Sequence, residues 1–536
     1  MLSQNKTRFI TSSLLLWAVV LLSACNEILQ SVDAANAANA ANAANADNAD
    51  DSSALDEQLD SLIVLKRLAA ITRGTAVPDI SEPMAQLGKK LFFSKGLSGD
   101  ENVACATCHH PALQGADQLS LSVGVNATLP DQLGLSRFAI DDDLPIGRNS
   151  PTVFNAALWR QSLFWDGRVE RLDSGAISTP DSALNQPDSA AGATLLAAQA
   201  KFPVVSEAEM LGSHFGLTEN DAEVRALLAQ RLGEQTTGLA TNEWLSHFQQ
   251  AFGRIDSAEN LITFANIALA ISDYERSMLF IDSPWQAYLD GDTAALSVAQ
   301  KRGALLFFST PQEGGADCAS CHEGPTFTDE RFNLVAFPQF GAFTLLPEGD
   351  VGRENVTFDS ADRYRFRTPS LLNVELTAPY GHAGSYGSLE QVLAHYTNPQ
   401  QTVERYFANA DYCDLPQFRA RVDCTSLFPN AQRVSMLALD ELAAAQNNNQ
   451  QNNNQQNNTR QNNNQSDNNQ QNNNQSGNGN GRVLRASRLS SGEVSDLVAF
   501  LQALTDPCAA ELDCVAPWIA QDPLDNPDGR MLTARF

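Results

Sequence analysis

The sequence has few basic residues for its length, with 35 Lys and Arg against 63 Asp and Glu in 536 residues, and a net charge of −28. Nucleic-acid binding needs clustered Lys and Arg, so this function is excluded. A long apolar run is also missing, because the most apolar stretch, residues 10–22, is too short for a stable membrane span. Alternating strand patterns are few. The helical patterns at 260–279, 389–395 and 490–504 predict a mainly α fold with long loops.

The first 25 residues have the pattern of an export signal. Lys6 and Arg8 precede the apolar stretch, which ends in Leu22-Ser23-Ala24-Cys25. This ending resembles the lipobox of bacterial lipoproteins, with an ordinary secretory signal as the alternative. The resemblance implies that residues 1–24 are a signal peptide and that Cys25 carries a lipid anchor in the periplasm. By the same resemblance, Asn26 favours the outer membrane.

Two segments are too polar or too repetitive to form a core. Residues 34–50 repeat Ala-Ala-Asn and then become acidic, so residues 25–60 are expected to act as a tether. Residues 446–481 consist almost wholly of Asn, Gln, Gly and Ser. We expect a disordered insertion there, within a globular region that resumes near Val483.

The strongest chemical signal is a Cys-x-x-Cys-His motif that occurs twice. This is the attachment motif of c-type haem: the thiols bind the haem vinyl groups and the His supplies an axial nitrogen to iron. Each copy follows an aromatic-rich segment, at 87–93 and 300–308, so the chain also contains an internal repeat. One copy could be a thioredoxin-like pair or half a zinc site, but two copies in an exported chain predict two covalent haem groups. The residues are Cys105, Cys108 and His109 in the first copy, and Cys318, Cys321 and His322 in the second. The predicted haem domains are residues 61–283 and 284–536.

Four cysteines remain: Cys413, Cys424, Cys508 and Cys514. Their spacing suits two local disulfides in an oxidising compartment. Four cysteines allow three connectivities, so the spacing alone leaves the pairing open.

Further motifs resemble those of the bacterial di-haem cytochrome c peroxidase family, which includes MauG. They are Arg148-Asn149-Ser150-Pro151-Thr152-Val153-Phe154-Asn155, Phe164-Trp165-Asp166-Gly167-Arg168, the stretch 366–374 and the stretch 376–385. The resemblance covers most of residues 80–400 and the helix after 485. It implies that the N-terminal haem reacts with hydrogen peroxide and that the C-terminal haem receives and stores electrons. His109 and His322 would then be the proximal ligands of the two irons.

The same resemblance assigns two catalytic residues. Glu209, in the phrase Val205-Ser206-Glu207-Ala208-Glu209-Met210, is the expected acid–base group that moves a proton between the peroxide oxygens. The match departs from the family pattern because Pro203 is displaced and residues 172–200 look like an insertion. A solvated carboxylate at a helix start is the alternative. Trp165 would relay electrons between the haems, with core packing as its alternative.

Two positions bear on the subtype. Many of these peroxidases have a capping His where this sequence has Val125, so the resemblance implies an open first iron unless His110 or His214 replaces it. The far ligand of the second iron falls at Tyr396, which is 17 residues after Pro379; His395 and Met436 are the alternatives. A Tyr ligand favours ferric and higher oxidation states and is typical of MauG-like proteins.

The family also carries a calcium ion between the haems. Asn149, Thr377 and Pro379 match its protein ligands, and a hard cation suits such oxygen donors. The expected partners are hydrogen peroxide and either a small cytochrome c or cupredoxin donor or, for MauG-like chemistry, a residue of a partner protein. The competing hypothesis is a non-enzymatic electron-transfer cytochrome with two closed haems.

Overall fold

The computed structural model describes residues 52–72, 74, 77–140, 144–213, 215, 220–234, 239–462, 481–522 and 525–536. The chain divides into two compact units, residues 1–65 and 66–536. In the first unit, residues 52–65 are helical, so the end of the predicted tether at 25–60 is wrong. The signal peptide, Cys25 and the rest of the tether lie outside the described residues. Within the described ranges, no helix is long and apolar enough to cross a membrane.

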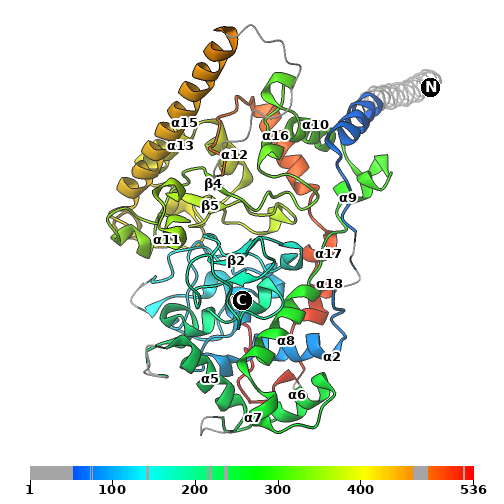
Figure 1. Ribbon diagram of the computed structural model, residues 1–536, viewed down its shortest axis with the longest axis vertical. Coiled ribbons are helices and arrows are strands. Elements are labelled where there is room, and N and C mark those ends of the chain that lie inside the picture. The colour runs from blue at the N-terminus through cyan, green and yellow to red at the C-terminus, as the bar shows by residue number, and fades with distance from the viewer. Residues whose placement is uncertain are drawn as a thin grey trace, which may run out of the picture. The chain divides into compact units, whose positions relative to one another are not determined.

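The second unit is mainly helical, as predicted, and contains two helix pairs of the same design (Figure 1). Helix α2 (Pro83–Phe93) packs on α8 (Phe264–Ser277), and α10 (Val298–Phe308) packs on α16 (Ser491–Gln502). Both contacts depend on a glycine. A Cβ on Gly88 would lie 1.9 Å from the carbonyl oxygen of Ala270, and a Cβ on Gly303 would lie 2.0 Å from that of Asp496. The two pairs support the internal repeat that the sequence predicted.

The three helices expected from periodicity are present. The expected helix at 260–279 is divided into α7 (Ala258–Leu261) and α8, because Thr263 caps α8 by accepting a hydrogen bond from Asn266 N. Helix α12 (Leu389–Thr397) begins after the cap Ser388, and α16 begins with a capping box between Ser490 and Glu493. A side-chain cap satisfies one of the free N–H groups at a helix start, which fixes where the helix begins.

The core around α2 and α8 also holds the end of the chain. The other helices of this region are α4 (Leu195–Gln199), α5 (Asp221–Leu232) and α6 (Trp244–Phe252), and the returning segment adds α17 (Pro507–Ala510) and α18 (Leu512–Val515). Ala509, Val515, Ile519 and Leu532 are buried in this core beside Leu91 and Trp244. The predicted assignment of residues 284–536 to one C-terminal domain is therefore wrong for the last thirty or so residues, because their apolar side chains pack in the N-terminal core.

The region around α10 and α16 contains the remaining helices: α9 (Pro284–Leu289), α11 (Glu354–Thr357), α12, α13 (Pro399–Asn409), α14 (Cys424–Leu427) and α15 (Ala431–Asn462). Helix α15 runs into the predicted disordered insertion at 446–481, so the backbone is helical as far as Asn462. Residues 463–480 lie outside the described residues. The predicted local disulfides are present as Cys413–Cys424 and Cys508–Cys514.

Two small antiparallel sheets flank the middle of the second unit. Strands β1 (Ser162–Leu163), β2 (Val169–Arg171) and β3 (Ile177–Ser178) pair in chain order, with Leu163 opposite Val169 and Arg171 opposite Ile177. Strand β4 (Phe332–Leu334) pairs with β5 (Arg365–Arg367), and Asn333 lies opposite Phe366. The strands are short: Trp165 lies in the turn between β1 and β2, and Arg367 is the last residue of β5.

Candidate active site

The first Cys-x-x-Cys-His motif forms one short helix, α3 (Cys105–Cys108), directly followed by His109. The Nδ1 of His109 lies 3.3 Å from the carbonyl oxygen of Gly115 and 3.2 Å from Ser150 Oγ, which itself donates to the carbonyl oxygen of Cys108. Burial lowers the pKa of His109 to about 4. A neutral imidazole whose Nδ1 faces a carbonyl oxygen is the usual state of a metal-binding His, because the other ring nitrogen is then available to the metal.

The second motif repeats this arrangement. Cys318–Ser320 form a short 3₁₀ turn, and the Nδ1 of His322 lies 3.1 Å from the carbonyl oxygen of Phe327. Burial also lowers the pKa of His322. The four motif cysteines are free, whereas the other four described cysteines form disulfides. Burial raises the pKa of Cys105 to about 12, which does not suit a redox-active thiol pair, whose pKa must be low. The donor sets therefore fit two covalent haem groups.

Glu209 lies beside the first motif. It belongs to a single π-helical turn, Glu207–Leu211, which follows a 3₁₀ turn at Pro203–Val205. Burial raises the pKa of Glu209, and a weaker opposing effect comes from Arg168. The Glu209 carboxylate also acts electrostatically on the buried thiol of Cys108. Glu209 therefore lies within electrostatic range of Cys108, and π-helical turns are frequent at functional sites.

Of the two histidines considered as caps of the first iron, the structure describes His110 and not His214. His110 is 1% exposed, its ring packs edge-on against Phe93 and Phe536, and its Nδ1 accepts a hydrogen bond from Ala112 N. His214 lies outside the described residues. Val125, which stands at the expected capping position, packs against the apolar core of this region. Its side chain has no atom that could bind iron.

Three residues compete as the far ligand of the second iron. Burial, together with the nearby thiols of Cys321 and Cys318, raises the pKa of Tyr396 well above its usual value, so Tyr396 lies near the second motif. His395 is fully buried, with Nδ1 2.9 Å from the Tyr386 hydroxyl and Nε2 2.7 Å from the Val335 carbonyl oxygen. Both of its ring nitrogens are thus engaged.

Met436, the third candidate, is partly buried in helix α15. It packs against an apolar cluster that includes Leu334, Val403 and Leu439. The contacts of Met436 therefore belong to the packing of α15. Of the three candidates, Tyr396 is the one whose electrostatic neighbours are the motif cysteines.

Trp165 joins two of the motifs that carry the family resemblance. Its indole Nε1 donates to the carbonyl oxygen of Asn149 at 2.9 Å, and its own carbonyl oxygen accepts from Arg367 N at 2.9 Å. Asn149 belongs to the N-terminal half of the second unit and Arg367 to strand β5 of the C-terminal half. Trp165 therefore lies where the two halves meet.

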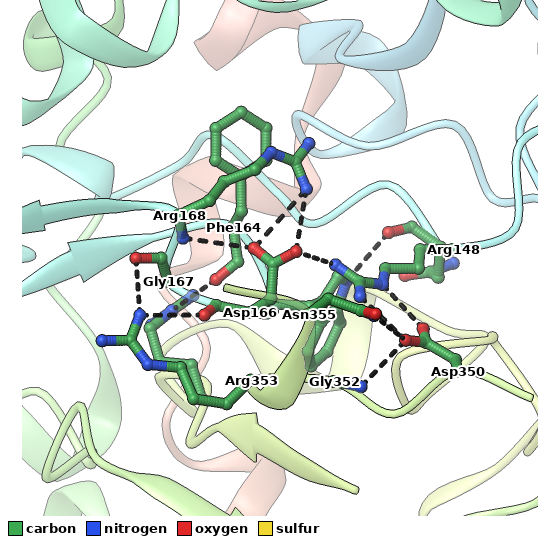
Figure 2. Close-up of polar contacts among 12 residues, drawn as sticks. Arg148, Phe164, Asp166, Gly167, Arg168, Asp350, Gly352, Arg353 and Asn355 are labelled. Carbon is green, nitrogen blue, oxygen red and sulfur yellow. Dashed lines mark hydrogen bonds and ion pairs between the residues drawn. The ribbon is translucent and has the colours of Figure 1, made fainter. Parts of the chain in front are cut away.

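Next to Trp165 is a buried ionic network that sequence reasoning missed (Figure 2). The Arg148 guanidinium lies between two carboxylates, with Nη1 2.6 Å from Asp166 Oδ2 and Nε 2.7 Å from Asp350 Oδ2. Arg168 also contacts Asp166, and Arg353 donates to the carbonyl oxygens of Asp166 and Gly167. Although burial alone would raise it, the pKa of Asp166 falls to about 2 because Arg148 and Arg168 stabilise its charged form. Arg148 and Asp166 belong to motifs quoted in the sequence analysis, and these motifs could have pointed to the network. Asp350 belongs to no such motif.

The expected calcium ligands lie in adjoining segments. Asn149 N donates to the carbonyl oxygen of His382 at 2.8 Å, which brings Asn149 beside the segment that contains Thr377 and Pro379. The Asn149 side-chain amide donates to Leu119 O at 2.8 Å, so its Oδ1 is the atom that could serve a cation. Among the described residues, no group of three or more His, Cys, Asp or Glu is arranged to hold a metal ion.

Comparison with known proteins defines the class of this chain. The family model for di-haem cytochrome c peroxidase matches residues 82–294. Cytochrome c551 peroxidase of Pseudomonas aeruginosa is 34% identical over 324 residues, which cover 60% of this chain and 73% of that relative. The chain belongs to the di-haem cytochrome c peroxidase family, so it is an oxidoreductase and the electron-carrier alternative is not favoured.

The family includes relatives with another name. MauG of Methylorubrum extorquens is 30% identical over 331 residues, covering 62% of this chain and 73% of the relative. MauG of Methylophilus methylotrophus is 30% identical over 317 residues, covering 58% and 71%. The family resemblance drawn from the motifs is therefore confirmed, and the two haem c groups that the family implies fit the two motifs described above.

Proposed function

We propose that the chain reacts with hydrogen peroxide at the first haem site and that the oxidising equivalents pass through Trp165 to the second. A haem attached at Cys105 and Cys108 would supply the redox chemistry. His109 would hold its iron through the ring nitrogen that does not face Gly115 O. Glu209 accepts a proton from one peroxide oxygen and returns it to the other, which turns the second oxygen into water as leaving group.

One observation carries this proposal: Glu209 is half-buried within electrostatic range of Cys108, and burial raises the pKa of its carboxyl group. A carboxyl group with a raised pKa holds a proton more readily, which suits a group that accepts a proton and then returns it. Its neighbour Glu207 lies on the same turn and is exposed to solvent, so the two differ in environment and not in local backbone. Of the two carboxyl groups on this turn, Glu209 is thus the more buried one.

Tyr396 and Val125 support the MauG-like version of this chemistry, in which a residue of a partner protein gives up the electrons. A phenolate oxygen on the second iron would stabilise oxidised states and would make that haem a poor electron store. Val125 leaves the first site without a capping side chain. A small cytochrome c or cupredoxin donor is the alternative, and the acidic chain would attract a basic partner of either kind.

The proposal extends to the location and the further metal. Export to the periplasm with a lipid anchor at Cys25, on the outer membrane, rests on the lipobox-like ending and on Asn26. A calcium ion held by Asn149 Oδ1 and the carbonyl oxygens of Thr377 and Pro379 would need several waters, because these donors are few and neutral. Its presence can be tested by metal analysis of the purified protein before and after treatment with a chelator.

The experiment that tests the function is an EPR spectrum of the oxidised holoprotein, followed by reaction with stoichiometric peroxide. We expect a high-spin signal beside a low-spin one, and a Glu209→Gln variant that reacts about 10²- to 10⁴-fold more slowly. Glu207→Gln is the matched control and should react at the wild-type rate. Equal rates for Glu209→Gln and the wild type would show that Glu209 is not the acid–base group. Two low-spin signals and no reaction with peroxide would overturn the proposed function.

A further inference from the structure

Arg137 is a buried arginine whose side chain donates hydrogen bonds to the backbone of one loop. It is 2% exposed, and its guanidinium donates hydrogen bonds to four carbonyl oxygens. Two of these lie on one side of the loop, Val123 O at 2.6 Å and Gly124 O at 2.8 Å, and two on the other, Pro130 O at 2.8 Å and Gln132 O at 3.0 Å. Arg137 therefore ties the segment 123–124 to the segment 130–132.

The carboxylates nearest Arg137, those of Asp131 and Asp117, accept none of these four hydrogen bonds. Asp131 contacts Lys95 Nζ at 2.7 Å and accepts from Thr533 Oγ1 at 2.9 Å. Asp117 accepts from Leu119 N at 3.0 Å. The donors of Arg137 thus serve the shape of the loop. A planar guanidinium, with its fixed fork of N–H donors, suits this task better than the single nitrogen of a lysine.

The segment that Arg137 holds lies directly against the turn of Glu209. A Cβ on Gly124 would lie 2.0 Å from Ala208 O and 2.7 Å from Glu209 O, so the two backbones touch. Val125 N donates to Ala208 O at 3.3 Å, and Asn102 Nδ2 donates to Val125 O at 2.8 Å. The backbone next to Glu209 is therefore braced by the segment 123–125, which is itself braced by Arg137.

We propose that Arg137 is a positioning residue for the peroxide site: it holds segment 123–125 against residues 208–209 and so fixes the Glu209 carboxyl beside Cys108. The inference rests on the proposed function, in which Glu209 transfers the proton. It also gives the loop a second task. The segment keeps Val125, which cannot bind iron, at the place where a capping side chain would otherwise stand.

The primary test is the Arg137→Lys variant of the full-length holoprotein, which keeps the charge but cannot reach carbonyl oxygens on both sides of the loop. Misplacement of a reacting group by about 1 Å can cost 10²-fold in rate. We expect the rate with stoichiometric peroxide to fall about 10- to 100-fold. We also expect a changed high-spin EPR signal of the first haem, an unchanged signal of the second, and a shift in the pH profile of the rate, which a loss of stability alone would not produce.

Arg365→Lys is the matched control. Arg365 is also buried and also donates to backbone carbonyl oxygens, Ala361 O at 2.8 Å and Gly481 O and Arg482 O at 3.0 Å, but it lies in the C-terminal half. The Arg365→Lys variant should be less stable than the wild type but keep its peroxide rate, EPR spectrum and pH profile. An Arg365→Lys variant that shows the same changes at the first haem as Arg137→Lys would overturn the inference.

Gly124→Ala tests the contact of segment 123–125 with residues 208–209 without changing a charged side chain. It is the deciding test of the inference if Arg137→Lys fails to fold. Its methyl group must push the segment away from Ala208, so we expect the same slow reaction and the same changed signal. Wild-type behaviour of either variant, in rate, first-haem signal and pH profile, would overturn the inference. Absence of any peroxide reaction in the wild type would instead refute the proposed function, and the first-haem signals of the variants would still report on the loop.

Discussion

The bidentate ion pair between Arg148 and Asp350 offers a sharp test of what burial does to a salt bridge. Its two hydrogen bonds measure 2.7 and 2.8 Å, and the Asp350 side chain is 2% exposed. Arg302 and Asp496 form a pair of the same geometry, at 2.8 and 3.0 Å, but the Arg302 side chain is 45% exposed. The two pairs differ mainly in their access to water, so they can be compared directly.

The expected cost follows from that difference. Removing one partner of a buried pair costs roughly 3–5 kcal/mol because it leaves an uncompensated charge, whereas an exposed pair contributes about 0–1 kcal/mol. Asp350→Asn keeps the size of the side chain, and Asp166 still contacts Arg148. We therefore expect the free energy of unfolding to fall by about 3 kcal/mol in Asp350→Asn, the lower end of the range, and by less than about 1 kcal/mol in Asp496→Asn.

The assay is unfolding in urea followed by far-ultraviolet circular dichroism, with both haem groups attached. For a denaturant slope of about 3 kcal/mol per molar, the midpoint should fall by about 1 M for Asp350→Asn. For Asp496→Asn it should fall by less than about 0.3 M. Equal shifts for the two variants would refute the reasoning from burial. The first transition is the relevant one, because a chain with several cores need not unfold in one step.

Three further predictions concern acid stability, the second iron and helix packing. The pKa of Asp166 is depressed to about 2, so its ionised carboxylate adds about 2 kcal/mol to the free energy of unfolding above pH 4. This contribution is lost as the pH falls toward 2. Urea midpoints measured from pH 5 to pH 2 should show the loss in the wild type, and the Asp166→Asn variant should not show it. Tyr396→Phe should alter the EPR signal of the second haem and leave that of the first unchanged. Tyr412→Phe, which changes a buried tyrosine of the apolar cluster against which Tyr396 packs, should alter neither signal. An unchanged second signal in Tyr396→Phe would exclude Tyr396 as the ligand. Gly303→Ala should destabilise the protein by about 1–3 kcal/mol despite the better helix propensity of Ala, because the new Cβ would meet Asp496 O. Gly492→Ala, with open space around it, should be neutral or slightly stabilising. Thermal melts in which Gly492→Ala is the less stable variant would contradict the packing argument.

The motifs allowed the functional residues to be predicted because haem attachment and its ligands are local patterns. Cys-x-x-Cys-His needs only five consecutive residues, and the aromatic segment before each copy marked the repeat that became the pairs α2–α8 and α10–α16. The helical patterns at 389–395 and 490–504 were equally local, so the starts of α12 and α16 were predicted to within one residue. Glu209 was nominated from a short phrase, and its catalytic role stays a prediction.

Features that depend on contacts between distant segments were missed. The return of residues 507–536 to the N-terminal core could not be inferred, because its apolar side chains would fit either core. The predicted disorder at 446–481 followed composition alone and gave no sign that α15 continues to Asn462. The role of Asp350 depends on a partner 202 residues away. Arg137 bonds to carbonyl oxygens within 14 residues, but its role depends on the contact of Gly124 with residues 208–209, and no local pattern marks either residue.

The sequence by itself therefore determined the chemistry of this protein: two haem attachment motifs, their proximal histidines, a mainly helical fold and the family. Tertiary structure alone decided which polar groups support that chemistry. Arg137 and the Arg148–Asp350 pair act through burial and through contacts with backbone or charge from other segments. Such groups are ordinary arginines and aspartates until folding removes water from around them, and only then does their placement acquire an energetic consequence.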